Sequence, residues 1–175
     1  MIAGALPTGT EVVGADYATL LKLAPRADIV IGDWWHKIRV DGPVIERLGR
    51  CRLIQQPSAG YENIDAEAAA AAAIPVANAG PANAGPVAEH AVMAAIACLR
   101  FLPEATRAAA EGEWDRQHFL DLDLWDLDQR TVGILGLGAI GMATAARLHA
   151  FGSKVIYNKR RRLDPADEER LQLSY

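Results

Sequence analysis

The sequence predicts an α/β protein built around parallel β-sheet, and three observations support this prediction. About half of the 175 residues are apolar (51%) and 23% are charged, a balance that suits a buried core and argues against a disordered chain. Short apolar runs alternate with helical stretches, which is typical of parallel sheets. One such run leads directly into Gly136-Leu137-Gly138-Ala139-Ile140-Gly141, a G-x-G-x-x-G turn that a helical pattern follows.

Composition excludes several classes of protein. The net charge of −4 and the pI of about 5.5 argue against a nucleic-acid binder. Cys51 and Cys98 are too few for a disulfide framework and are not spaced as metal ligands, so we expect no metal site and a reducing, cytoplasmic compartment. Met1 to Thr10 lacks the basic region of a signal peptide, and no apolar run reaches the roughly 20 residues of a membrane helix. We therefore expect no membrane partner.

The first half of the chain predicts a small parallel sheet. Met1 to Gly14 is typical of the end of a first helix. Strands are expected at Ala27–Ile31, Cys51–Gln56 and Pro75–Asn78. Helices are expected at Pro43–Leu48 and in the Ala-rich stretch that follows Asp65, whose side chain is a suitable N-cap.

The middle of the chain predicts a long helix and a connecting segment. Asn78 to Gly85 is a turn-rich loop, and Pro86 opens a helix to about Leu102 whose small residues permit close packing. Glu104–Trp114 is expected to be helical. Glu111–Asp128 carries seven acidic residues and one Arg, which indicates a solvated connecting segment.

The strongest chemical signal lies between Thr131 and Asn158. Thr131–Leu135 and Lys154–Asn158 are typical of strands, and a helix is expected from about Ile140 to Phe151 with Ala143, Ala146 and Leu148 on its apolar side. This is a β-α-β unit of the length that binds dinucleotides.

Each glycine of the turn has a predicted mechanical role. Gly136 permits the tight turn, Gly138 lets the backbone approach a pyrophosphate, and Gly141 lets the helix pack closely on the strand. The N–H groups and the positive dipole end of the helix then face the phosphates, which adds Ala139 and Ile140 to the predicted cofactor site. The alternative is a glycine-rich turn between a strand and a helix that binds no ligand.

The end of the second strand bears on the choice of cofactor. Sites that prefer NAD usually place Asp or Glu about 20 residues after the glycines. Asn158 stands here, followed by Lys159, Arg160 and two more Arg. A missing carboxylate and adjacent cations favour the 2′-phosphate of NADP, with NAD as the alternative. The other interpretation of the four basic residues is a solvated face.

Five ordered motifs resemble one enzyme family. The motifs are Leu53–Asp65, Asn78–Asn83, Val87–His90, Gly112–Trp114 and Thr131–Gly141. Together they are similar to the D-isomer-specific 2-hydroxyacid dehydrogenases, and the resemblance runs from about Asp28 to Arg162. It implies a portion of a flavodoxin-like substrate domain in residues 1–84 and the start of a Rossmann domain, with an incomplete doubly wound parallel sheet, in residues 85–175.

The resemblance also implies a function and a substrate site. Members of the family transfer hydride between a nicotinamide cofactor and a 2-hydroxy or 2-keto acid, and they dimerise through the region of the long helix. They hold the substrate carboxylate partly through backbone N–H groups of the loop that matches Ser58, Ala59 and Gly60. An ordinary turn between a strand and a helix is the alternative for this loop. Glu89 and His90 match a pair that lies away from the family's catalytic dyad, which implies a structural role.

No catalytic residue can be assigned by matching motifs. The family's catalytic Arg, Glu and His lie beyond the second Rossmann strand, so the expectation is a fragment of an enzyme of roughly 300 residues, inactive by itself and with only two strands in its Rossmann sheet. A dinucleotide-binding corepressor without enzymatic activity, or an inert truncated chain, is the alternative. The sequence does not specify which 2-hydroxy acid is the substrate.

Overall fold

The structure is a computed structural model that describes residues 6–113 and 115–175. The chain forms two compact units, unit 1 (Met1–Gly80) and unit 2 (Pro81–Tyr175). Each unit contains a three-stranded parallel sheet covered by helices, which confirms the predicted α/β class. The predicted division of roles between residues 1–84 and 85–175 stays a prediction.

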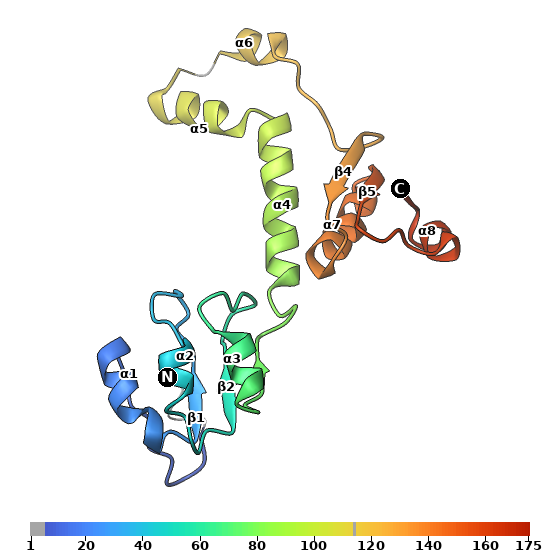
Figure 1. Ribbon diagram of the computed structural model, residues 1–175. Coiled ribbons are helices and arrows are strands. Elements are labelled where there is room, and N and C mark those ends of the chain that lie inside the picture. The colour runs from blue at the N-terminus through green and yellow to red at the C-terminus, as the bar shows by residue number, and fades with distance from the viewer. Residues whose placement is uncertain (1–5, 114) are drawn as a thin grey trace. The chain divides into compact units, whose positions relative to one another are not determined.

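Unit 1 is built on the sheet order β1-β2-β3 (Figure 1). Its strands are β1 (Ile29–Ile31), β2 (Leu53–Gln55) and β3 (Val76–Ala77). All three predicted strands are present but shorter than expected: β1 begins after Ala27 and Asp28, and the residues after Gln55 and Ala77 leave the sheet for loops. Val30 and Ile54 are buried against apolar residues of the helices, whereas Ile29 and Ile31 stay 53% and 44% exposed. The core of unit 1 therefore lies on one face of its sheet.

Aspartate caps set where two helices of unit 1 begin. The Asp16 side chain accepts from the backbone N of Thr19 at 2.8 Å, at the start of α1 (Tyr17–Leu23). The predicted cap Asp65 accepts from the N of Ala68 at 2.9 Å, at the start of α3 (Ala66–Ala71). A short 3-10 turn (Ala24–Arg26) follows α1, and α2 (Gly42–Ile45) lies between β1 and β2.

The helix predicted at Met1–Gly14 is absent from the residues that can be tested. Residues 6–14 contain no helix, and residues 1–5 lie outside the described part of the chain. Pro7 and Gly9 interrupt the segment, and Gly9 has φ +90°, a left-handed conformation that a right-handed helix excludes.

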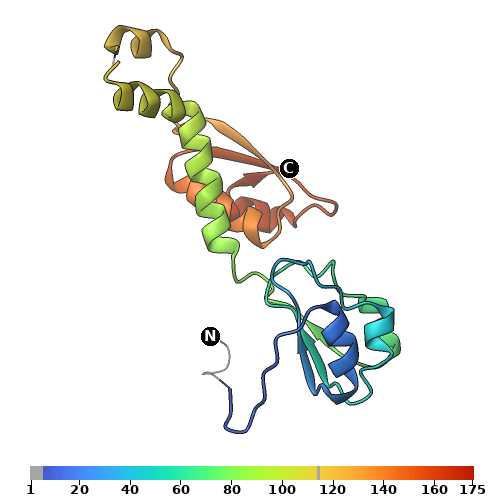
Figure 2. The same cartoon turned by 90° about the vertical axis from the view of Figure 1, so that its left-hand side faces the viewer.

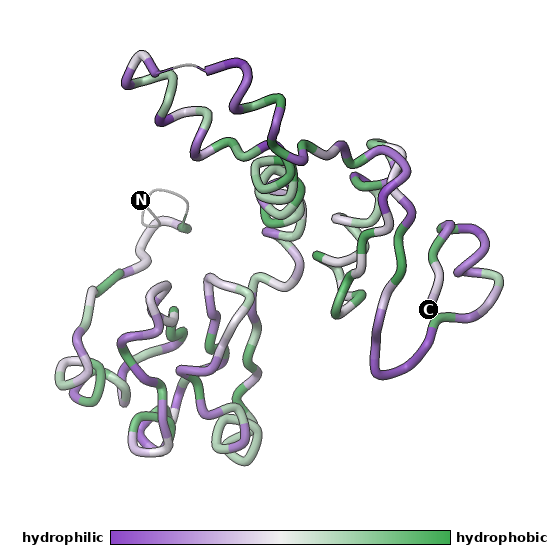
Figure 3. The backbone as a smooth tube through the Cα atoms, turned by 90° about the horizontal axis from the view of Figure 1, so that it is seen from above, coloured by the Kyte–Doolittle hydropathy of each residue, from purple (hydrophilic) through white to green (hydrophobic). Residues whose placement is uncertain are grey.

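Unit 2 begins with the long helix α4 (Ala84–Leu99), which packs along α7 (Ala139–Ala150) in both side views (Figures 1 and 2). Viewed nearly end-on, α4 is hydrophobic around most of its circumference (Figure 3). It begins two residues before the predicted start and ends at Leu99, because Phe101 adopts φ +50° and turns the chain into α5 (Leu102–Glu111). Among the described helices none alone is long and apolar enough to cross a membrane; α4 and α5 pass that test only as a pair bent by 66°.

The acidic segment Glu111–Asp128 contains more structure than predicted. It includes α6 (Arg116–Asp121), which begins where the Asp115 side chain accepts from the N of Gln117 at 2.9 Å. Phe119 and Leu127 are buried, so the segment is not only a solvated connection. Because the segment is rich in acidic residues, its sequence did not indicate that these two apolar residues are buried. Trp114, the last residue of the predicted helix before it, lies outside the described part of the chain.

The predicted β-α-β unit forms with the predicted strand bounds. The strands β4 (Thr131–Leu135) and β5 (Lys154–Asn158) pair in parallel from Thr131↔Lys154 to Leu135↔Asn158. The buried stripe of α7 is Gly141, Ala145 and Leu148. The prediction for Ala146 was wrong, because this residue is exposed. The face of α7 that packs against the sheet and α4 carries Ala145 instead, one residue earlier.

The sheet of unit 2 has a third strand, so the expectation of only two was wrong. After α8 (Pro165–Leu171), β6 (Leu173–Ser174) pairs in parallel with β5, giving the order β4-β5-β6. Leu173 is buried in the core of unit 2. Two residues are too short a run to show strand periodicity in the sequence.

Candidate functional site

The glycine turn joins β4 to α7 under tight steric limits. Gly136 has φ +96°, and its backbone N donates to the carbonyl of Asn158 at 2.9 Å. A Cβ on Gly141 would lie 2.4 Å from the carbonyl oxygen of Gly136 and 3.3 Å from Cγ2 of Ile134. The first turn of α7 therefore rests directly on the end of β4, and only glycine permits this distance.

Gly138 has no such steric role in the fold. It is the N-cap residue of α7 with φ −91°, and a Cβ there would meet no atom within 4 Å. Among the described residues, no side chain caps this helix. The N–H groups of the first turn, which include Ala139 and Ile140, therefore point out of the helix end toward open space. An open approach to uncapped amides at the positive end of a helix suits an anionic pyrophosphate.

The predicted residues at the end of β5 lie next to this turn. Because Leu135 pairs with Asn158, both strands end at the same edge of the sheet, and the Gly136 amide contacts the Asn158 carbonyl. Asn158 and Arg160 are exposed and Lys159 is half-buried. The structure thus gathers all predicted cofactor residues of unit 2 at one sheet edge.

Arg162, the last residue of the basic run, is engaged in an internal ion pair with Glu168. Its Nε and Nη2 donate to the two carboxylate oxygens of Glu168 at 2.8 and 2.7 Å. The Tyr157 hydroxyl donates to the same carboxylate at 2.6 Å and accepts from the N of Leu163 at 2.9 Å. Arg162 first, and then Tyr157, lower the pKa of Glu168 to about 2, while burial and the nearby Glu168 raise the pKa of Tyr157. This cluster closes the loop that carries Lys159 and Arg160.

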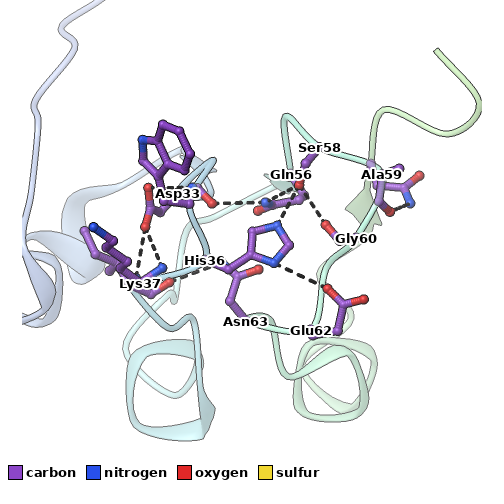
Figure 4. A network of polar contacts seen from close by, with 12 residues as sticks. Asp33, His36, Lys37, Gln56, Ser58, Ala59, Gly60, Glu62 and Asn63 are labelled. Carbon is purple, nitrogen blue, oxygen red and sulfur yellow. Dashed lines mark hydrogen bonds and ion pairs between the residues drawn. The ribbon is translucent and has the colours of Figure 1, made fainter. Parts of the chain in front are cut away.

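In unit 1 the predicted substrate loop has a fixed backbone (Figure 4). The carbonyl of Ser58 accepts from the N of Ala79 at 3.0 Å, and that of Ala59 from Nδ2 of Asn78 at 2.6 Å. The carbonyl of Gly60 accepts from the Ser58 hydroxyl at 2.9 Å. A planar peptide directs its N–H opposite its carbonyl, so these bonds also orient the next amides. Within residues 6–113 and 115–175, the N–H groups of Ala59 and Gly60 have no hydrogen-bond partner.

A buried glutamine that the sequence analysis missed supports this loop. Gln56 is fully buried, and its Nε2 donates to the carbonyl of Asp33 at 3.1 Å and to Oγ of Ser58 at 2.8 Å. A Cβ on Gly32 would lie 1.9 Å from Oε1 of Gln56, so glycine makes room for this side chain. The signal in the sequence was the position of Gln56, a polar residue directly after the strand β2.

The loop after β1 places His36 against Ser58. The Asp33 carboxylate accepts from the backbone N atoms of Trp35, Lys37 and Ile38, and the first of these bonds is the main reason that its pKa is lowered. This arrangement holds His36 at φ +57° with its Nε2 2.7 Å from Oγ of Ser58. No motif surrounds His36 in the sequence, so sequence patterns alone assign it no role.

The motif residues Glu89 and His90 lie on α4 of unit 2. Glu89 pairs with Arg147 at 2.8 Å and so links α4 with α7, and His90 is exposed.

A parallel strand that runs through G-x-G-x-x-G into an uncapped helix, with a second parallel strand beside it, defines unit 2 as a Rossmann-type dinucleotide-binding unit. Residues 92–175 of the chain belong to the D-isomer-specific 2-hydroxyacid dehydrogenase family. The family model for its NAD-binding domain matches residues 92–175, which indicates a nicotinamide cofactor.

Relatives with known names agree with this assignment. D-3-phosphoglycerate dehydrogenase of Methanocaldococcus jannaschii is 36% identical over 137 residues, which are 78% of this chain and 25% of that protein. Glyoxylate reductase of Thermococcus gammatolerans is 35% identical over 135 residues, 75% of this chain and 40% of that protein. A formate dehydrogenase structure from Granulicella matches with a TM-score of 0.75 at 34% identity, over 88% of this chain and 41% of that one. The chain therefore spans less than half the length of these relatives.

Proposed function

We propose that this chain supplies the cofactor turn and the carboxylate loop of an oxidoreductase that transfers hydride between a nicotinamide cofactor and a 2-hydroxy or 2-keto acid. The observation that carries the proposal is the turn Gly136–Gly141, which is open to an anion at Gly138 and closed to any side chain at Gly141. A turn with only a folding role would need Gly141 and would not need Gly138.

The residues of this chain bind and orient the reactants. The amides of Ala139 and Ile140 and the positive end of α7 hold the pyrophosphate, and the residues after β5 face the adenosine ribose. When bound, the nicotinamide supplies or accepts the hydride. The oriented N–H groups of Ala59 and Gly60 hold the carboxylate of the acid, because an anion gains most from donors fixed before it binds.

The same edge of the sheet favours NADP over NAD. Asn158 removes the carboxylate that would repel a 2′-phosphate, and Lys159 and Arg160 stand beside it. Arg162 does not contribute because Glu168 binds its guanidinium. One charge-assisted hydrogen bond, discounted for exposure to about 1.4 kcal/mol, corresponds to about tenfold preference for NADPH.

Calorimetric titration with NADH and NADPH tests the proposed cofactor site. We expect saturable binding of both, tighter for NADPH, and loss of both in Gly138→Ala with the fold intact. In the enzyme that contains this sequence, the same substitution raises the KM for the dinucleotide in the reduction of a short 2-keto acid. Unchanged dinucleotide binding by Gly138→Ala would overturn the proposal.

A further inference from the structure

The hydroxyl of Ser58 has more polar neighbours than it has hydrogens. Its Oγ lies 2.8 Å from Nε2 of Gln56, 2.9 Å from the carbonyl oxygen of Gly60 and 2.7 Å from Nε2 of His36 (Figure 4). The amide nitrogen of Gln56 can only donate and the carbonyl of Gly60 can only accept. The single hydrogen of Ser58 therefore goes to Gly60, provided that His36 does not take it.

The hydrogen on Nε2 of His36 decides this competition. With hydrogen on Nε2, the ring donates to Ser58, and all three contacts of the hydroxyl are satisfied. Without it, Nε2 accepts the hydrogen of Ser58, and the carbonyl of Gly60 loses its donor. The other ring nitrogen, Nδ1, lies 3.4 Å from Oε2 of Glu62, where a hydrogen is also favourable. Only the imidazolium, with hydrogen on both nitrogens, satisfies both partners at once.

We propose that His36 is a positioning residue of the substrate loop, which with hydrogen on Nε2 fixes the Gly60–Tyr61 peptide through Ser58 and as the imidazolium also favours a carboxylate at the loop. This inference rests on the proposed function in taking Ser58–Gly60 as the carboxylate loop. His36 acts through Ser58 and exchanges no proton with the substrate.

Charge and space around the ring support this role. The charged groups that face or flank His36 are Glu62, which is 80% exposed, and Asp33 and Lys37 of its own loop. The Asp33 carboxylate is engaged by backbone amides of that loop. A Cβ on Gly60 would lie 3.1 Å from Cε1 of His36 and 2.6 Å from Oε2 of Glu62. The Glu62 carboxylate lies as close to Gly60 as the ring does and repels an anion, so the imidazolium offsets this repulsion where the neutral ring does not.

The first test needs no ligand. Imidazole is the side chain that ordinarily changes charge between about pH 5 and 8. In proton–nitrogen NMR spectra of the chain, we expect the amide signals of Gly60 and Tyr61 to move with pH at the same midpoint as the ring signal of His36. In His36→Gln, whose amide can still donate to Ser58, both signals should stay constant; His90→Gln, an exposed control, should behave as wild type. Amide signals that ignore the His36 titration, or that still move in His36→Gln, would overturn the proposal.

The second test adds oxalate as a small carboxylate probe. We expect wild type to bind oxalate roughly three- to tenfold more tightly below the His36 midpoint than above it, with a difference that shrinks as salt is added. Binding by His36→Gln should not depend on pH in this range. If the amide signals of Gly60 and Tyr61 follow the His36 ring but oxalate shifts the signals of neither Ala59 nor Gly60, the assignment of Ser58–Gly60 as the carboxylate loop is wrong. This failure is distinct from failure of the first test.

Discussion

Substituting two glycines of the same turn should separate its folding role from its ligand role. In Gly141→Ala, the new Cβ would lie 2.4 Å from the carbonyl oxygen of Gly136, a backbone atom that cannot rotate away. Overpacking of this kind costs about 1–3 kcal/mol, and replacing glycine inside a helix returns up to about 1 kcal/mol. A clash this short with a backbone atom lies in the upper part of the overpacking range, at about 2–3 kcal/mol, so the net destabilisation of unit 2 should be about 1–2 kcal/mol.

Hydrogen exchange of the amides in β4 and β5 measures this loss directly. A destabilisation of about 1–2 kcal/mol speeds exchange through opening of unit 2 by about 5- to 30-fold. In Gly138→Ala, the new methyl group meets no protein atom within 4 Å, so exchange should match wild type. The same methyl group should weaken NADH binding at least about tenfold, because it occupies the approach to the helix amides.

The reverse pattern would refute this reasoning. If Gly141→Ala exchanged like wild type, the contact with Gly136 would not limit the fold. If Gly138→Ala bound NADH normally, the open space at Gly138 would have no role in binding.

Three further predictions concern single residues. The folded-state pKa of Glu168 is about 2 against an ordinary 4.5. The stability that this carboxylate contributes is therefore fully present above about pH 4.5 and is lost as pH falls toward 2. In acid unfolding, Glu168→Gln should lack this pH-dependent loss of stability, and a Glu169→Gln control that also lacked it would contradict us. Arg160→Ala should shrink the preference for NADPH over NADH at low salt in calorimetry, and an unchanged preference would make the basic run only a solvated face. Met93 is 53% exposed on α4, the helix of the expected homodimer, so light scattering should find a dimer in wild type and a monomer in Met93→Glu; a monomeric wild type at micromolar concentration would contradict this expectation.

The sequence predicted those parts of the fold that local patterns determine. The bounds of β4 and β5 were predicted correctly because each run is apolar, of strand length and ended by a turn or a change to polar residues. The predicted cap at Asp65 forms because an N-cap bond lies within four residues. The positions of Gly136 and Gly141 follow from a motif whose geometry is also local.

Features that depend on residues far apart in the chain were missed. β6 exists only because Leu173 packs against β5, and a two-residue strand leaves no periodic signal. α6 is anchored by the buried Phe119 within an acidic stretch. His36 and Ser58 are 22 positions apart, and only the parallel pairing of β1 with β2 brings their loops together. No local pattern predicts such a contact.

Titration of the isotope-labelled chain with NADH, followed by backbone amide signals, tests the central claim most directly. We predict saturable one-to-one binding, with the largest changes at Gly136–Gly141 and smaller ones at Asn158–Arg160. Absence of saturable changes, or changes confined to residues outside these two segments, would contradict the claim that this turn is the nicotinamide-dinucleotide site of the chain.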